Sequence, residues 1–162
     1  MTSKLFPNMQ LSARLFVFNS ESELTESMSE DFSNSLAPFL AAWKAHGAAL
    51  DAGFRLIANR VLFIVVDEEA QTATGCSIDS LTHFLKQSGV NWFDRTKILH
   101  APSITSLDGP WSVSDLGEFH SALKSGEIPL DHLVLNTTVL RLEDFRKNGL
   151  QTVSESWHSR ML

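Results

Sequence analysis

Val61-Leu-Phe-Ile-Val-Val-Asp67 is the stretch that decides the fold. An unbroken apolar run that ends in an acidic residue is typical of a central strand covered on both faces. The segment from Gly53 to Ala58 is also of β type, and only Asn59-Arg60 separates it from this run. The sequence therefore predicts an antiparallel hairpin, although Asn-Arg is not a preferred turn pair.

A long helix is predicted before this hairpin. Apolar residues recur every three or four positions from Leu24 to Trp43, which is typical of a helix with one buried face. Ser20 and Glu23 fit a capping box at its start, and Gly47 is a C-terminal stop signal. Because Pro38 lacks a backbone donor, we expect a kink there or two abutting helices.

The remaining elements are shorter. We predict strands at Leu11 to Phe18, Lys97 to His100, Leu133 to Leu135 and Thr137 to Leu140, a long loop from Ala101 to Trp111, and helices at Ser77 to Gln87, Leu116 to Leu123 (capped by Ser112 or Ser114) and Leu142 to Lys147. The order is roughly βαββαβαβα. It predicts a single α+β domain over residues 1–162, with a mixed sheet of about four to five strands and helices packed on it.

Composition excludes several classes of protein. At 162 residues, with 43% hydrophobic and 20% charged residues, the chain has the composition of one globular domain. The longest apolar run is far shorter than the ~20 residues that span a bilayer, and the N-terminus lacks the apolar core of a signal peptide. A single cysteine forms no internal disulfide, and a net charge of −6 without Lys/Arg clusters argues against nucleic-acid binding. We expect a soluble, cytoplasmic protein that binds neither nucleic acid nor membrane.

Cys76 lies where a short polar loop enters the second predicted helix, in Thr74-Gly-Cys-Ser-Ile-Asp79. The positive end of a helix favours a reactive thiolate, but Asp79 in the first turn opposes it. His83 lies about 10 Å farther along the helix, beyond hydrogen-bond reach. Two interpretations remain: a small buried core residue, which we favour, or a reactive or ligand-binding thiol.

Other polar residues stand at the ends of the predicted elements. We interpret Ser77 as the cap of the second helix and Asp79 as favourable to its dipole, with an anion site at this helix start as the alternative. Asp67 closes the central strand, where a carboxylate either acts as base or ligand or simply marks the return to solvent. Trp43 continues a buried stripe, and His46 suits the negative end of the first helix.

The sequence carries no established reaction motif. Phosphate-binding, dinucleotide-binding and α/β-hydrolase signatures are absent, and the histidines lack the spacing of zinc ligands. We therefore predict no metal and no cofactor. Trp111 and Trp157 flank loops, where they either cover the core or line a pocket or partner surface.

Four segments together resemble a family of uncharacterised bacterial proteins of this length: Trp43-x-x-His46-Gly47, Val65-Val66-Asp67-Glu68, Thr74-Gly75-Cys76-Ser77-Ile78-Asp79 and Ser156-Trp157-His158-x-Arg160. Members of that family are sometimes labelled ABC-transporter ATPases. The absence of a phosphate-binding loop contradicts that label for this chain. The resemblance implies no activity, so it only marks positions for testing.

Two hypotheses about function follow. The favoured one is a non-catalytic cytoplasmic domain that binds a small molecule or a protein through a pocket formed by Trp43, His46, Asp67, Cys76, Ser77 and Asp79. The alternative is a small enzyme in which Cys76 is the nucleophile, His46 the base and Asp67 the orienting acid. Homodimerisation through a strand edge or the Trp-bearing loops is compatible with the pattern but not required by it.

Overall fold

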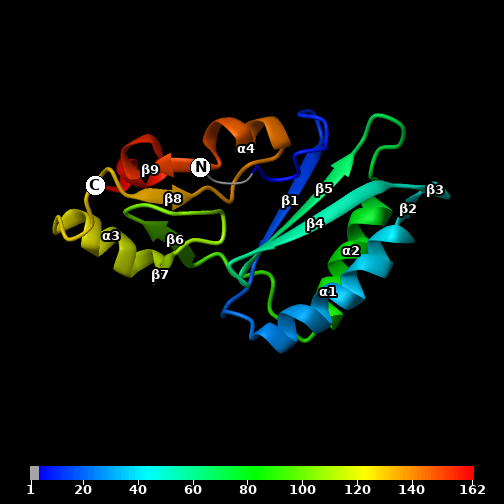
Figure 1. Ribbon diagram of the computed structural model, residues 1–162, viewed down its shortest axis with the longest axis horizontal. Coiled ribbons are helices and arrows are strands. Elements are labelled where there is room, and N and C mark those ends of the chain that lie inside the picture. Colours follow the sequence, from blue (N-terminus) through cyan, green and yellow to red (C-terminus); the bar gives the residue numbers. More distant parts are fainter. Residues whose placement is uncertain (1–3) are drawn as a thin grey trace.

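The computed structural model describes residues 4–162 as three antiparallel sheets with four α-helices (Figure 1). The strands are β1 (Arg14–Asn19), β2 (Lys44–Ala45), β3 (Ala48–Ala49), β4 (Asp51–Ile57), β5 (Val61–Asp67), β6 (Lys97–Ala101), β7 (Ser112–Asp115), β8 (Leu133–Leu135) and β9 (Leu150–Thr152). The helices are α1 (Glu26–Ala41), α2 (Gly75–Gln87), α3 (Leu116–Lys124) and α4 (Leu142–Asn148), followed by the 3-10 turns η1 (Val153–Glu155) and η2 (Trp157–Met161). The predicted α+β class is confirmed.

The predicted hairpin is confirmed, with β5 at the centre of a three-stranded sheet in the order β1-β5-β4. Ile57 pairs with Val61, so the turn holds three residues, Ala58 to Arg60. Ala58 and Asn59 both have positive φ, at 56° and 52°. An asparagine tolerates this left-handed conformation, which explains how a sequence without a preferred turn pair still reverses direction.

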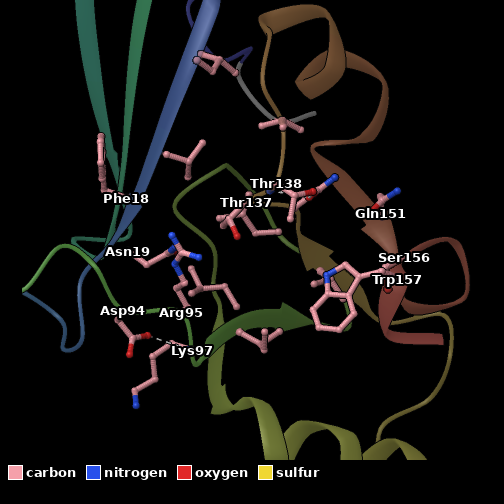
Figure 2. A pocket seen from close by; sticks show the side chains of 18 of the residues that line it. Phe18, Asn19, Asp94, Arg95, Lys97, Thr137, Thr138, Gln151, Ser156 and Trp157 are labelled. Carbon is pink, nitrogen blue, oxygen red and sulfur yellow. Dashed lines mark hydrogen bonds between the residues drawn. The ribbon is translucent and has the colours of Figure 1, made fainter. Parts of the chain in front are cut away.

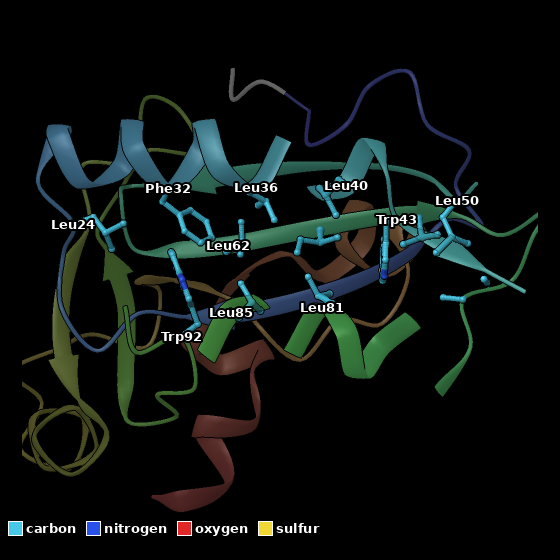
Figure 3. Close-up of a cluster of buried hydrophobic side chains, with 14 residues drawn as sticks. Leu24, Phe32, Leu36, Leu40, Trp43, Leu50, Leu62, Leu81, Leu85 and Trp92 are labelled. Carbon is cyan, nitrogen blue, oxygen red and sulfur yellow. The ribbon is translucent and has the colours of Figure 1, made fainter. Parts of the chain in front are cut away.

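Successive side chains of β5 enter two different cores. Leu62, Ile64 and Val66 pack in the first core, which α1 and α2 cover (Figure 3). The first core is completed by buried residues of those helices, of β2 and of the loops around them: Leu24, Phe32, Leu36, Leu40, Trp43, Ala45, Leu50, Ala73, Leu81, Leu85 and Trp92. Because side chains alternate along a strand, an apolar residue at every position fits burial on both faces.

The second core joins the three-stranded sheet to the C-terminal half. Val61, Phe63 and Val65 of β5 contribute to it from one side. Opposite them lie residues of the four-stranded sheet β7-β6-β8-β9, of α4 and of the connecting loops: Leu99, Leu107, Leu135, Val139, Leu142 and Phe145. The two halves of the chain therefore share one body of packed side chains rather than meeting at a polar interface.

The start and end of the first helix differ from the prediction. Thr25, rather than Ser20, caps α1, and its side chain accepts a hydrogen bond from the Met28 N–H at 3.1 Å. The helix is one element that contains Pro38 and ends at Ala41. Gly47, with φ of 78°, instead turns the short β2–β3 hairpin, which the sequence pattern did not predict. Two-residue strands of Lys and Ala carry no hydrophobic periodicity that would reveal them.

The second helix begins earlier than predicted. Thr74 caps α2, and Ser77 forms the reciprocal half of a capping box instead of being the cap. Ser112 to Asp115 forms β7, which pairs with β6, and Asp115 rather than a serine precedes α3. The strands form three antiparallel sheets and not the single mixed sheet that we predicted. Within residues 4–162, no helix has the length and apolar character needed to cross a membrane.

Candidate ligand-binding cavity

The six residues of the predicted pocket are brought together only in part. The indole Nε1 of Trp43 donates a hydrogen bond of 2.8 Å to the backbone oxygen of Ser77, and both residues are buried. This bond ties the end of the α1 segment to the first turn of α2. The contact satisfies a buried indole N–H, and it belongs to the first core.

The other four residues do not complete a pocket around this contact. His46 is exposed in the β2–β3 turn, and Cys76 and Asp79 are exposed at the start of α2. Asp67 is half-buried, and its Oδ1 accepts a hydrogen bond from the Glu69 N–H at 3.0 Å. The alternative enzyme hypothesis requires a hydrogen bond between Cys76 and a histidine. Among residues 4–162, no such hydrogen bond is present.

The exposure of Cys76 contradicts our favoured interpretation of it as a buried core residue. Because α2 starts at Gly75, the thiol lies on the solvent side of the first turn while Ser77 takes the buried position.

We predict that iodoacetamide alkylates Cys76 in the folded protein at a rate within about threefold of that in the urea-unfolded chain, since exposed thiols need no unfolding to react. Labelling by mass spectrometry measures both rates. A rate that rises tenfold or more on unfolding would contradict this placement.

A cavity of about 700 Å³ lies between the three-stranded sheet and the C-terminal sheet (Figure 2). Its walls come from four parts of the chain: Leu15 to Asn19 of β1, Trp92 to Arg95 with Lys97 to Leu99, Val134 to Leu140, and Gln151 with Ser156 to His158. None of the six residues that we predicted for the pocket lines it. The cavity forms where the two sheets diverge beyond the second core, so it depends on tertiary arrangement rather than on one motif.

Asn19 provides an unsatisfied polar group in the cavity wall. It is the last residue of β1, where it pairs with Val61 and bridges to Phe93. Its backbone oxygen accepts a hydrogen bond from the Asp94 N–H at 3.2 Å. Its side-chain Oδ1 is buried and has no hydrogen-bond partner among the described residues. A buried polar atom without a partner costs about 1–3 kcal/mol. Because Oδ1 has essentially no exposed surface, this cost belongs to the packing of the wall.

Three charged side chains line the same wall, and two of them are engaged. The Asp94 carboxylate accepts hydrogen bonds from the backbone N–H groups of Thr96 and Lys97, at 3.1 and 3.0 Å. Lys97 forms an ion pair of 2.6 Å with Asp115, and this hydrogen bond raises the pKa of Lys97 and lowers that of Asp115. Arg95 belongs to none of the three ion pairs found among residues 4–162. Figure 2 shows its side chain extending into the cavity toward Asn19.

Small polar residues line the wall that faces β1. Asn136 organises them, because its Oδ1 accepts hydrogen bonds from the Thr138 N–H at 2.9 Å and the Thr138 hydroxyl at 2.7 Å. Its own backbone N–H donates to the oxygen of Gly149 at 2.8 Å, which anchors the turn to the end of α4. Thr137 lies in the same wall. The turn is thus fixed by its own hydrogen bonds and presents hydroxyl and amide groups to the cavity.

Trp157 and His158 form the fourth wall. The rings of Trp157 and His158 lie 4.0 Å apart, and His120 of α3 contacts the indole edge-on with ring centres 5.7 Å apart. His120 Nε2 and His158 Nδ1 are joined by a hydrogen bond of 3.0 Å. Burial, together with a smaller effect of the neighbouring His120, lowers the pKa of His158 to about 4. Burial also lowers the pKa of His120. Both rings are therefore neutral at pH 7, and they hold a half-exposed indole at the cavity.

Sequence reasoning found only one part of this site. We interpreted Trp157 as a loop tryptophan that covers the core, with a pocket or partner surface as the alternative, and its position in the cavity wall agrees with that alternative. Asn19, Arg95 and Thr137 carried no signal, because each stands alone in its local sequence and they meet only in the folded chain. Among residues 4–162, no group of three or more His, Cys, Asp or Glu side chains is arranged to hold a metal ion.

Comparisons of the chain with protein-family models, with curated proteins and with solved structures find no match. The site must therefore be interpreted from its own geometry.

Proposed function

We propose that this protein is a non-catalytic domain that binds a small organic molecule in the cavity between its two larger sheets. The observation that carries the proposal is a cavity of about 700 Å³ that combines aromatic side chains with Arg95, a cation that belongs to none of the three ion pairs found among residues 4–162. A guanidinium without an acidic partner can form hydrogen bonds to an acceptor group of a ligand.

The size and composition of the cavity support this function. Its volume of about 700 Å³ lies within the range of roughly 300–1,000 Å³ that is typical of small-molecule sites. Its walls combine aromatic and aliphatic side chains, among them Phe18, Phe93 and Trp157, with a few polar groups at defined positions. An apolar lining supplies affinity while the polar groups fix orientation.

The proposal keeps the favoured hypothesis of a non-catalytic binding domain, but it places the binding site in a different part of the structure from the predicted pocket. A cytoplasmic protein remains our proposal for the cellular setting, since the chain has one cysteine and no helix of residues 4–162 that suits a membrane. Membership of the uncharacterised bacterial family remains a prediction that rests on the four quoted sequence segments.

The test is a screen of small organic molecules against the folded protein, in which differential scanning fluorimetry detects binding as a rise in Tm. A ligand present at 100 times its Kd stabilises the folded state by about 2.7 kcal/mol, which raises the Tm of a chain of this size by roughly 5–10 °C. Hits are then examined by intrinsic fluorescence, and we expect Trp157 to report binding because it lines the cavity.

Two variants locate the binding. Trp157→Phe keeps an aromatic ring in the wall, so the ligand should still raise the Tm while the fluorescence change is largely lost. Thr137→Phe adds a phenyl ring to the cavity wall, and it should reduce the Tm shift without lowering the Tm of the free protein by more than a few degrees. Binding that survives Thr137→Phe unchanged, or a screen without any hit, would refute the proposal.

A further inference from the structure

We propose that this protein forms a homodimer in which the outer edge of β4 pairs with the same edge of a second copy. The two strands run antiparallel around a two-fold axis at Gly53, and Asp51 of each copy lies opposite Arg55 of the other. This pairing joins two three-stranded sheets into one continuous sheet. It is independent of the proposed ligand site, because no residue of β4 lines the cavity.

The outer edge of β4 has no neighbouring strand in the chain. Within residues 4–162, β4 pairs with β5 alone, along its whole length, and no other backbone hydrogen bond reaches the segment from Asp51 to Leu56. In an antiparallel ladder, every second residue turns its N–H and C=O away from the paired strand. β4 therefore presents a row of backbone donors and acceptors that a further strand can bind.

The other sheet edges are covered or short. On the outer side of β1, the Leu15 N–H donates to the oxygen of Leu140 at 2.9 Å, and the Asp94 N–H donates to the oxygen of Asn19 at 3.2 Å. The edge strands β7 and β9 of the C-terminal sheet hold only four and three residues. Short strands, prolines and bulges are usual protections of an edge. β4 has seven residues, no proline and an unbroken register with β5, so it has none of these three.

The two charges of β4 select the register of the pairing. Asp51 and Arg55 lie two positions to either side of Gly53, so their side chains share one face of the sheet. Antiparallel pairing about Gly53 is the register that places Asp51 opposite Arg55, and the two-fold axis forms this contact twice. Opposite charges directly across two strands stabilise their pairing, whereas like charges there destabilise it.

Both charges are available for this contact. Asp51 is exposed and belongs to none of the three ion pairs found within residues 4–162. Arg55 contacts Asp108 of its own chain through one guanidinium nitrogen at 3.1 Å. A guanidinium has further N–H donors, so Arg55 can bind a second carboxylate without losing the first.

Gly53 is explained by the same arrangement. Its φ is not positive, and a Cβ added to it would meet Val65 Cγ1 at the ordinary contact distance of 3.7 Å, so the fold of one chain does not require a glycine here. A glycine in the interior of a strand weakens the strand, and it often marks a bulge or the close approach of another backbone. Since the register excludes a bulge, close approach of a second copy accounts for it.

The opposite face of β4 also gains from the pairing. Ala52 and Phe54 are only partly buried, at the margin of the first core. In the register about Gly53, each Phe54 lies opposite Ala52 of the second copy. The pairing therefore covers apolar surface at the margin of the first core of each copy.

The test begins with sedimentation velocity of the full chain. Because a strand edge is a small interface, we expect a reversible dimer with a Kd of roughly 10–100 μM. Samples on either side of this range should change from monomer to dimer as the concentration rises. A chain that stays monomeric at concentrations well above the range would overturn the proposal.

Charge reversal tests the register. Asp51→Lys places a lysine opposite Arg55 at both contacts, and Arg55→Glu places a glutamate opposite Asp51 at both. Each variant alone should therefore dimerise at least fivefold more weakly than the wild type. In an equimolar mixture, the heterodimer has opposite charges at both contacts, so its Kd should return to within about threefold of the wild-type value.

Two control variants separate this effect from general changes of charge. Asp108→Asn removes the in-chain partner of Arg55 but leaves the β4 edge intact, and it should change the Kd less than twofold. Lys147→Glu reverses an exposed charge on α4, and it should also have less than a twofold effect. A dimer that is unaffected by both β4 reversals, or a mixture that dimerises as weakly as its components, would overturn the pairing.

Discussion

Phe63→Ala is expected to lower the free energy of unfolding by about 3–5 kcal/mol, which is the usual cost of removing a fully buried phenyl ring. Phe63 is 0% exposed at the middle of β5, and its ring meets Phe145 of α4 edge to face with ring centres 5.3 Å apart. The substitution therefore opens a cavity in the second core, where the two halves of the chain are joined. For a domain of this size, the Tm should fall by roughly 10 °C. Urea unfolding followed by circular dichroism measures the change.

The matched control is Leu130→Ala. Leu130 is 47% exposed, so removing its side chain should alter the free energy of unfolding by less than about 0.5 kcal/mol. A single unfolding transition is expected in both variants, because β5 contributes to both cores. A loss of less than about 1 kcal/mol in Phe63→Ala, or two separate transitions, would show that the halves do not depend on this packing.

Acidification is expected to destabilise the protein between pH 6.5 and pH 4, before most carboxylates titrate. His158 is 2% exposed with a pKa of about 4, whereas a histidine in the unfolded chain has a pKa near 6.5. Within this window His158 is protonated in the unfolded chain but neutral in the folded chain, so the stability of the fold rises with pH. The contribution of neutral His158 to the free energy of unfolding is complete above pH 6.5, and it is lost as the pH approaches 4. At 1.36 kcal/mol per unit of pKa, it amounts to about 3 kcal/mol at most.

The bond between His120 and His158 gives the geometric reason. Nε2 of one ring and Nδ1 of the other lie 3.0 Å apart, and one of the two nitrogens must accept the hydrogen bond. Protonating the pair leaves two donors facing each other and places like charges side by side. The rings also support Trp157, so loosening them disturbs one wall of the cavity.

The free energy of unfolding of the wild type and of His158→Asn, measured at pH 7.0, 5.5 and 4.5, checks this prediction. The variant should be less stable at pH 7.0, because it loses packing, but its stability should change much less with pH. His46→Asn serves as the control, since His46 is exposed in the β2–β3 turn and its removal should leave the pH dependence intact. Parallel pH profiles for the wild type and His158→Asn would contradict the role of this pair.

The β4–β5 hairpin and α2 were predictable because their signals are local. Six apolar residues in a row describe a strand buried on both faces without reference to any partner, and the stripe of α2 repeats at helical spacing. Helix starts were harder. Ser20, Thr25, Thr74 and Ser77 are all acceptable caps, and the choice among them depends on which residues the tertiary packing buries.

Strand pairing and the site depended on distant parts of the chain. β7 reads Ser-Val-Ser-Asp and is a polar strand at the edge of its sheet, so only its pairing with β6 defines it. Trp43 and Ser77 were predicted to lie in one pocket; they contact each other, but through a hydrogen bond in the first core. Asn19 ends β1 and Arg95 lies in the loop before β6, and the contacts of Asn19 with Phe93 and Asp94 bring these distant parts of the chain together, a relation that no spacing along the sequence encodes.

The uncharged segment from Val61 to Val66 also has a consequence during synthesis and refolding. An uncharged, β-rich run of this kind pairs readily with copies of itself whenever its edges are free. The β4 edge is protected early, because a hairpin with a three-residue turn closes within microseconds. The opposite edge stays open until β1 pairs with it. In that pairing Asn19 lies opposite Val61, although α1 and β4 separate the two residues along the sequence. If β1 pairs slowly, that edge stays open during refolding. Aggregation at high protein concentration should therefore limit the yield of refolding, although the segment is fully buried in the folded chain.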